Sequence, residues 1–211
     1  MYRHSFSFSV RSGQLGFFLT DLGKSWDGMR NIIHNEKVSN FSIWNVGLVF
    51  FGYYESNYQS PVTVRIMGAL SPEIVSTYNW ISDPNQDMAL MYDDYGIVRK
   101  DKSMIRHRVF VTRLLTGNVA EYKRRHDAKK AQMSMTDFGP DSNFTIWNAG
   151  DYIFGYDEID TSMEHEMTQL EKQETVNWER HMLEIMEWLT NDVDWITNEQ
   201  HPSIKRICFE A

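Results

Sequence analysis

NFTIWNAGDYIFGYDE, residues 143–158, repeats a stretch that the chain has already used at residues 40–55, NFSIWNVGLVFFGYYE. Ten positions carry the same residue in both copies at a constant offset of 103, as between Trp44 and Trp147. In each copy two aromatic-rich runs flank an Asn-x-Gly turn, which is typical of a β-hairpin because glycine tolerates the positive φ of the reversal. The repeat predicts an internal duplication with two modules of about one hundred residues each.

The composition limits the class of protein. Of 211 residues, 42% are hydrophobic and 14% aromatic, so the chain can bury a sizeable core and is not a disordered protein. The single cysteine, Cys208, excludes an internal disulfide and favours a reducing compartment. A formal net charge of -8 argues against general binding of nucleic acids, and no apolar run approaches the roughly 18 residues that span a bilayer. We expect a soluble, cytoplasmic protein that binds neither nucleic acid nor membranes.

The first module is predicted over residues 1–99, before the charged linker at residues 99–102. Its N-terminal segment alternates apolar and serine residues as a strand does, and the segment after it changes to helical spacing. In order we expect a strand at His4–Val10, a helix at Gln14–His34, the hairpin, a helical region at Ser71–Asp83 that starts with a Ser-Pro cap, and a closing strand at Tyr95–Arg99.

The second module is predicted over residues 104–211. Asn118 is followed three residues later by Glu121, which resembles a capping box at the start of a helix. In order we expect a strand at Ile105–Leu114, a helix from Asn118 to Met133, a loop at Asp137–Asp141, the hairpin, an interrupted helix at Ser162–Leu189, and a closing strand at Ile204–Phe209. This order of strand, helix, strand, strand, helix, strand is typical of a ferredoxin-like α+β fold.

Three segments of the second module resemble the L-rhamnose mutarotase family. They are MIRHRVFV at residues 104–111, EYKRRH at residues 121–126, and WERHM at residues 178–182. The resemblance covers nearly all of residues 104–211, and its most specific part is the Glu-Tyr-x-Arg-Arg-His string. It implies a dimeric α/β barrel of ferredoxin-like subunits that interconverts the α and β anomers of a free sugar, with no cofactor and no metal.

The resemblance also implies roles for individual residues. His126 would be the proton donor and Tyr122 a substrate contact. Phe144 stands where the family usually has a substrate-contacting tyrosine, and Trp178 and Glu179 stand where it has a pair of tryptophans. These departures bear on the identity of the sugar more than on the presence of a sugar pocket.

The chemistry of mutarotation independently favours the same pair. Tyr122 and His126 are four residues apart, so on a helix their side chains share one face, about 5 to 6 Å apart at Cβ. Mutarotation needs a base for the anomeric hydroxyl proton and an acid for the ring oxygen. A histidine with a pKa near neutrality serves in both directions. Tryptophan and tyrosine rings would stack on the apolar face of a pyranose.

Each of these signals also has a purely structural interpretation. A tyrosine and a histidine one helical turn apart are common as partly buried structural residues, and Trp178 fits a core position as well as a pocket wall. The basic residues around His126, Lys123, Arg124, Arg125, Lys129 and Lys130, are expected on the exposed side of their helix. His165, Glu166 and His181 lack the spacing of a metal site and fit a solvated helix face.

The first module does not repeat the candidate pair. The offset of 103 places Leu19 and Gly23 at the positions of Tyr122 and His126, so we expect this module to be an inactive repeat. A duplication that fused a homodimer would give a monomer with an internal pseudo-dimeric α/β barrel. Its function would be that of a cofactor-independent aldose mutarotase, acting on L-rhamnose or a related sugar. The alternatives are a non-catalytic sugar-binding or regulatory module and, by fold analogy alone, a cofactor-free monooxygenase.

Overall fold

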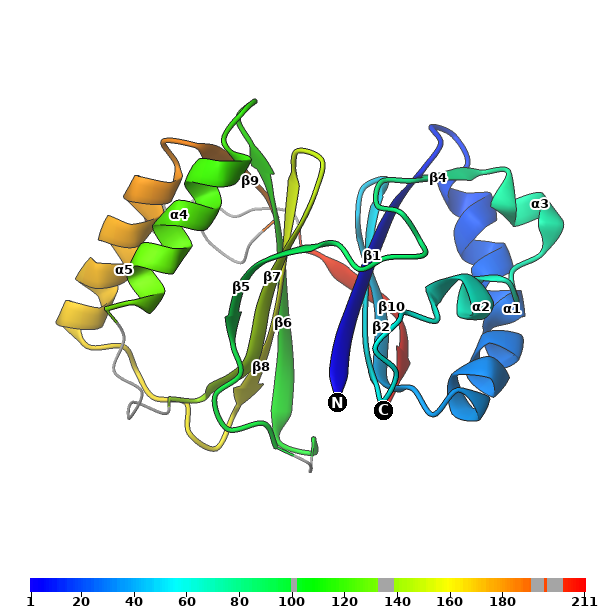
Figure 1. Ribbon diagram of the computed structural model, residues 1–211, viewed down its shortest axis with the longest axis horizontal. Helices are drawn as coiled ribbons and strands as arrows, with labels where there is room; N and C mark the ends of the chain where they lie inside the picture. Colours follow the sequence, from blue (N-terminus) through cyan, green and yellow to red (C-terminus); the bar gives the residue numbers. More distant parts are fainter. Residues whose placement is uncertain (100–101, 133–138, 191–195, 197–202) are drawn as a thin grey trace. The chain divides into compact units, whose positions relative to one another are not determined.

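The computed structural model describes residues 1–99, 102–132, 139–190, 196 and 203–211. It has a mixed α and β architecture with two open, five-stranded antiparallel sheets (Figure 1). The chain divides into two compact units, unit 1 with residues 1–88 and 204–211, and unit 2 with residues 89–203. Among the helices in the described ranges, none has both the length and the apolar character to cross a membrane.

Unit 1 packs its helices on one face of a sheet with the strand order β10-β2-β3-β1-β4 (Figure 1). Its longest helix buries Phe18, Leu22, Met29 and Ile33, which share one helical face, against the aromatic residues of the sheet. The elements are β1 (Tyr2–Val10), α1 (Leu15–Asn35), β2 (Ser39–Val46), β3 (Val49–Ser56), α2 (Thr63–Met67), α3 (Pro72–Val75), β4 (Tyr78–Trp80) and β10 (Lys205–Glu210).

Unit 2 has the corresponding strand order, β5-β7-β8-β6-β9, and two helices cover one face of this sheet (Figure 1). A core of apolar residues from both helices and the sheet fills the layer between them. The elements are β5 (Ala89–Asp94), β6 (Ile105–Leu114), α4 (Val119–Lys130), β7 (Asp141–Ala149), β8 (Tyr152–Asp160), α5 (Gln169–Met182) and β9 (Met186–Thr190).

The outermost strand beside each hairpin comes from outside the predicted module. The strand β5 lies near the end of the predicted first module but pairs with β7 in unit 2, and β10 lies at the end of the predicted second module but pairs with β2 in unit 1. Residues 204–209 therefore form a strand as predicted, but their predicted position as the closing strand of the second module is wrong. The two edge strands are equivalent in register, because Tyr92 pairs with Ile146 and Cys208 pairs with Ile43, one offset of 103 away.

The structure also differs from the predicted secondary structure in the last part of each module. The closing strands are β4 and β9, which lie in segments that we expected to be helical, and residues 95–99 are not a strand. The helix α3 ends after one turn, and α5 runs without the expected interruption. The remaining strands, α1, the start of α4 and both hairpins agree with the sequence analysis. Met133 and residues 137–138 of the expected loop lie outside the described residues, and Asp141, the last residue of that loop, already belongs to β7.

The repeated glycines have two distinct structural reasons. Gly47 and Gly150 close the hairpins with φ of 55° and 59°, the left-handed region that favours glycine. Gly52 lies opposite Phe6 in the register of β1 and β3, and a Cβ atom at Gly52 would stand 2.0 Å from the Phe6 ring. Gly155 has the same relation to Phe110 in unit 2. An aromatic ring lying across a strand glycine thus recurs in both sheets.

The repeated asparagine and glutamate form a buried polar cluster. Asn40 adopts φ 53° where the register between β2 and β3 shifts, and its amide donates to the Glu55 carboxylate at 3.3 Å. The Tyr53 hydroxyl donates to the same oxygen at 3.1 Å. These bonds compensate the buried carboxylate. Unit 2 builds the same arrangement from Asn143, Tyr156 and Glu158.

Candidate functional site

Helix α4 points its candidate residues at the sheet. Tyr122 and His126 are the buried residues of this helix, with 2% and 6% of their surface exposed. Their spacing of four places both on the face that packs against the core of unit 2. The predicted capping box at the start of the helix is absent, since the Asn118 side chain donates to Leu115 O and Thr116 O.

The imidazole of His126 is enclosed by three aromatic rings. It stacks on Tyr122 with ring centroids 4.3 Å apart, and it meets Trp178 of α5 edge-on at 5.0 Å. Tyr92 of β5 closes the third side at 5.5 Å. The histidine is therefore held at the point where α4, α5 and the edge of the sheet converge.

The hydrogen bond of His126 fixes its tautomer. Its Nδ1 atom lies 3.1 Å from the main-chain oxygen of Tyr122. A carbonyl oxygen only accepts, so Nδ1 carries the proton and the neutral ring presents a lone pair at Nε2. Tyr122 therefore positions the ring in two ways, through its carbonyl and through its own side chain.

The pKa of His126 departs from the near-neutral value that we expected. Burial lowers the pKa of His126 to about 4, and the nearby positive charge of Lys129 contributes to the lowering. At neutral pH the ring is uncharged and able to accept a proton. Burial also raises the pKa of the Tyr122 hydroxyl, so this hydroxyl stays protonated.

The other predicted residues lie nearby in different roles. The Phe144 ring, on β7, is 5.5 Å from Tyr92 and so extends the aromatic wall that starts at His126. Trp178 touches His126 directly. Glu179 is buried, and its carboxylate accepts a 2.7 Å hydrogen bond from the Trp188 indole. Four of the five candidates thus share one aromatic cluster, while Glu179 secures α5 to β9 beside it.

Two residues of the cluster were missed by the sequence analysis. Tyr92 precedes the second module in sequence, and only the pairing of β5 with β7 brings it beside His126. Lys129 is exposed as predicted, but the sequence did not show that its ammonium lies over the Trp178 ring, 4.2 Å from the centroid. Desolvation of the ammonium lowers the pKa of Lys129. Its spacing of three from His126 is the signal that could have placed it on the same side.

An ionic network fastens α4 to the end of α5. The Arg125 side chain is 9% exposed and bridges Glu121 on its own helix at 2.8 Å and Glu184 at 3.0 Å. It also donates to the main-chain oxygen of His181. Arg125 thus reaches His181 in the last turn of α5 and Glu184 just beyond it. These contacts fix the spacing between α4, which carries His126, and α5, which carries Trp178.

The polar and apolar groups limit what the site can do. Within the described ranges, no group of three or more His, Cys, Asp and Glu side chains is arranged to hold a metal ion. The cluster offers one basic nitrogen, aromatic faces and one ammonium. Such a site suits proton transfer on a small polar ring that stacks on aromatic side chains.

Comparison with known protein families gives a match in the second half of the chain. Residues 107–207 match the family model described as L-rhamnose mutarotase. The matched segment includes His126, Tyr122, Phe144, Trp178 and Glu179, and it begins after Tyr92. No curated protein and no solved structure matches the chain.

Proposed function

We propose, since the second half of this chain matches the L-rhamnose mutarotase family, that the protein is a cofactor-independent aldose mutarotase. The observation that carries the proposal is the position of His126 inside the matched segment, neutral and enclosed by aromatic rings from α4, α5 and β5. The substrate is L-rhamnose or a related free sugar, and the reaction interconverts its α and β anomers.

In the proposed mechanism His126 acts as a proton shuttle. Its Nε2 atom takes the proton from the anomeric hydroxyl, the bond from the anomeric carbon to the ring oxygen breaks, and an aldehyde forms. The two oxygens share one carbon, so the imidazolium can return the proton to the ring oxygen without moving far. After rotation of the aldehyde, the reverse steps close the ring to the other anomer with no net change in protons.

The low pKa favours the donor half of this role and makes His126 a weaker base than an ordinary histidine. A group whose pKa is about 4 gives its proton readily to an alkoxide-like ring oxygen, so the same residue acts as base and then as donor. Proton transfer of this kind contributes roughly 10² to 10⁴-fold in rate. In this proposal Tyr122 positions the imidazole, while Phe144 and Trp178 line the sugar and Glu179 supports the wall.

We also propose that the chain is a fused dimer. Residues 1–99 would be a divergent, inactive copy and residues 104–211 the active copy, each a ferredoxin-like module, together forming a pseudo-dimeric α/β barrel in a cytoplasmic monomer. The equivalent strand orders and the equivalent edge strands β5 and β10 support this proposal. Sedimentation equilibrium of the full chain should give a monomer, and a tight dimer would contradict the fusion.

Saturation transfer between anomeric protons tests the activity. The α and β signals of L-rhamnose, L-fucose, D-galactose and D-galacturonate are each irradiated in turn, with and without protein. We expect at least one sugar to exchange faster with the wild-type protein and to return to the buffer rate with His126→Ala. The matched control is His34→Ala, which removes an exposed histidine from α1 of unit 1.

Folding of the variants must be separated from chemistry. Because His126 is buried, His126→Gln is measured beside His126→Ala, and near-ultraviolet circular dichroism checks that the aromatic cluster is intact. A folded variant that retains full exchange activity would exclude His126 as the shuttle. If no sugar responds to the wild-type protein, the mutarotase proposal is wrong.

One observation favours a second candidate, a non-catalytic sugar-binding module. Phe144 and Glu179 differ from the residues that the family has at these positions, and Glu179 is engaged with Trp188. In that case the sugar signals would broaden in proportion to protein without exchange between anomers. The same NMR experiment therefore distinguishes the two functions.

A further inference from the structure

Asp157, on β8 of unit 2, has a buried carboxyl group that the proposed mechanism does not use. Only 2% of its surface is exposed. Within the part of the chain that the structure describes, its Oδ1 atom has no hydrogen-bond partner. A buried polar atom without a partner costs free energy, so each one that a folded protein keeps needs an explanation.

The side chain of Asp157 points toward the helices of unit 2. Gly155, two residues earlier on the strand, lies opposite Phe110, which belongs to the core between the sheet and the helices. Side chains alternate along a strand, and β8 pairs with β6 without a shift, so Asp157 shares this face of the sheet. Its cross-strand neighbour on β6 is Arg108.

On its other side Asp157 borders the aromatic wall of the His126 site. The register between β7 and β8 shifts at this point, and the resulting β-bulge sets Asn143 and Phe144 opposite Asp157. The centroid of the Phe144 ring is 5.5 Å from that of Tyr92, and the Tyr92 ring is 5.5 Å from the His126 imidazole. The carboxyl group is thus the next side chain beyond this wall.

The distance across the sheet suits one sugar ring. Tyr92, which touches His126, lies on β5, and Asp157 lies two strands further on. Neighbouring strands are about 4.8 Å apart, so the two positions are about 10 Å apart across the sheet. A pyranose with a hydrogen bond of about 2.8 Å at each end spans a similar length. Phe144, which lines the sugar in the proposed function, lies between them and is half-buried.

Unit 1 shows the same position with its polar atom satisfied by the chain itself. The repeat offset of 103 relates Tyr54 to Asp157. The Tyr54 hydroxyl accepts a 2.7 Å hydrogen bond from the main-chain N–H of Val62 and lies 3.1 Å from Thr63 Oγ1. The described part of unit 2 provides no such partner for Asp157 Oδ1, which leaves this atom available to a ligand.

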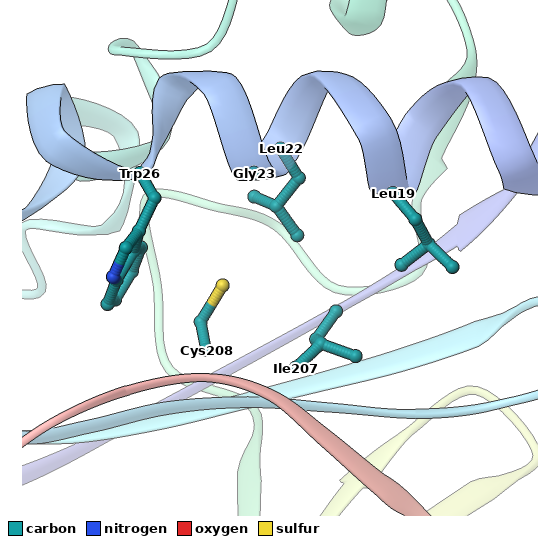
Figure 2. Close-up of a pocket in the computed structure, with 6 residues that line it drawn as sticks. All are labelled: Leu19, Leu22, Gly23, Trp26, Ile207 and Cys208. Carbon is teal, nitrogen blue, oxygen red and sulfur yellow. The ribbon is translucent and has the colours of Figure 1, made fainter.

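The pocket under the long helix of unit 1 has a different character. Figure 2 shows Leu19 and Trp26 of α1 facing Ile207 and Cys208 of β10, so apolar side chains and a thiol line it. Hydroxyl groups of a sugar would lose their hydrogen bonds to water there without replacement. Asp157 therefore distinguishes the helix-covered face of unit 2 as the one that offers a buried carboxyl group.

The ionisation of Asp157 also suits a hydroxyl group. Burial raises the pKa of Asp157 to about 8, and the negative charge of Asp141 contributes, while the positive charge of Arg108 opposes the rise. At neutral pH the carboxyl group is therefore mostly protonated, so it can both donate and accept a hydrogen bond. A sugar hydroxyl has the same two capacities.

We propose that Asp157 is a sugar-contacting residue, which binds a hydroxyl group on the side of the ring opposite the anomeric carbon while His126 acts at the anomeric carbon. This inference rests on the proposed function, because it places the sugar against the wall of the His126 site. The contacted hydroxyl takes no part in the reaction. Asp157 therefore determines how tightly the sugar binds and which sugar is accepted.

The affinity for L-rhamnose tests the contact. Ligand-detected saturation-transfer NMR gives the Kd, and the concentration dependence of anomer exchange gives KM and kcat. Asp157→Val, which has a similar shape but no polar atom, should raise Kd and KM about five- to tenfold and leave kcat nearly unchanged. Asp157→Asn keeps a donor and an acceptor, so it should bind almost as the wild type does. The matched control is Asp151→Val, at an exposed position of the same hairpin.

Deoxy sugars identify the hydroxyl group that Asp157 contacts. The analogues are 3-deoxy-L-rhamnose and 4-deoxy-L-rhamnose, which lack hydroxyls on the far side of the ring. One of them should bind the wild-type protein about five- to tenfold more weakly than L-rhamnose does. Asp157→Val should bind this analogue and L-rhamnose equally well, because each change removes one partner of the same hydrogen bond.

Thermal unfolding separates a sugar contact from a structural role. If Asp157 is kept for the sugar, Asp157→Val removes a buried, unpaired carboxyl group and should raise the midpoint of unfolding in the absence of sugar. If Asp157 instead stabilises the fold through Arg108, both Asp157→Val and Arg108→Met should lower the midpoint. A lowered midpoint for both variants would overturn the proposal.

The binding data can also contradict the proposal, and they separate it from the mutarotase activity. Absence of L-rhamnose binding to the wild-type protein, unchanged affinity in Asp157→Val, or a deoxy effect that persists in Asp157→Val would show that Asp157 does not contact the sugar. Anomer exchange that is insensitive to Asp157→Val would retain the mutarotase and reject the contact. Binding that depends on Asp157 without anomer exchange would retain the contact and reject the mutarotase.

Discussion

At the scale of single residues, burial decides the ionisation of the proposed shuttle. The pKa of His126 is about 4 in the folded protein, whereas an unfolded histidine has an ordinary value near 6.5. The unfolded chain therefore binds the extra proton first as the pH falls. The contribution of neutral His126 to the free energy of unfolding is therefore complete above pH 6.5 and is lost progressively toward pH 4.

The lowered pKa of His126 predicts how the free energy of unfolding changes with pH. Between pH 7 and pH 4 the wild-type protein should lose roughly 3 kcal/mol of unfolding free energy through His126. His126→Gln should lack this part of the slope, while His34→Ala should keep it. Urea unfolding at several pH values measures the difference, and equal slopes for the wild type and His126→Gln would contradict the buried neutral histidine.

The same pKa predicts the acid limb of the activity. Exchange of anomers should persist below pH 6 and fall only toward pH 4, because the neutral imidazole is the active form. Lys129→Met removes a positive charge that lowers the pKa of His126, so the limb should move to higher pH. Anomeric exchange rates between pH 4 and pH 8 test both predictions. Activity of the wild-type protein that already falls near pH 6.5 would contradict the lowered pKa of His126.

The strand glycines predict a second residue-scale effect. Gly155→Ala would drive a Cβ atom to within 2.0 Å of the Phe110 ring, so the strand or the ring must shift, at a cost of about 1 to 3 kcal/mol. Gly28→Ala is the control, because its Cβ would meet Ala69 at an ordinary 3.7 Å and alanine favours the helix. Thermal unfolding should place the two variants on opposite sides of the wild type.

At the scale of elements, the two helices of unit 2 begin differently. Thr168 and Glu171 form a reciprocal capping box at the start of α5, with the Thr168 side chain accepting from Glu171 N. Asn118 makes no such bond at the start of α4. Thr168→Ala should therefore cost about 1 kcal/mol, and Asn118→Ala less. Urea unfolding of the two variants compares them, and equal costs would argue against the box.

Local patterns predicted some elements and missed others for physical reasons. The hairpins were predicted because Asn-x-Gly and the alternating aromatic runs act over neighbouring residues. The strand β4 has three residues and β9 has five, which is too short for a period to emerge from the surrounding helical spacing. Their strand character comes from pairing with β1 and β6.

The candidate site shows the same limit. His126, Tyr122, Phe144 and Trp178 were found because they stand in a recognisable string or near it. Tyr92 carried no local signal, since its place beside His126 depends on the pairing of β5 with a strand about fifty residues later. The equivalence of Cys208 to Tyr92 could only come from comparing the registers of the two edge strands.

At the scale of the whole molecule, each sheet is completed by a strand that lies far away in sequence. Ending the chain at Ser203 removes β10 but no residue of unit 2. The exposed edge of β2 should then lose protection in hydrogen exchange, while β7 should keep it, because its neighbour β5 remains. Loss of protection in β7 with β2 unchanged would contradict the strand assignment.

The exchange of edge strands also bears on the order in which the protein matures during its synthesis. Domains commonly fold on the ribosome from the N-terminus onward. Unit 1 is translated first, yet its strand β10 is made after the described strands of unit 2, and the pair of Arg30 with Glu210 joins residues 180 positions apart. Unit 2 already has every one of its described strands before then. The earlier half of the chain must therefore wait with an unpaired β2 edge until residues 205–210 are made, and so it is the half that most needs protection from aggregation in the cell.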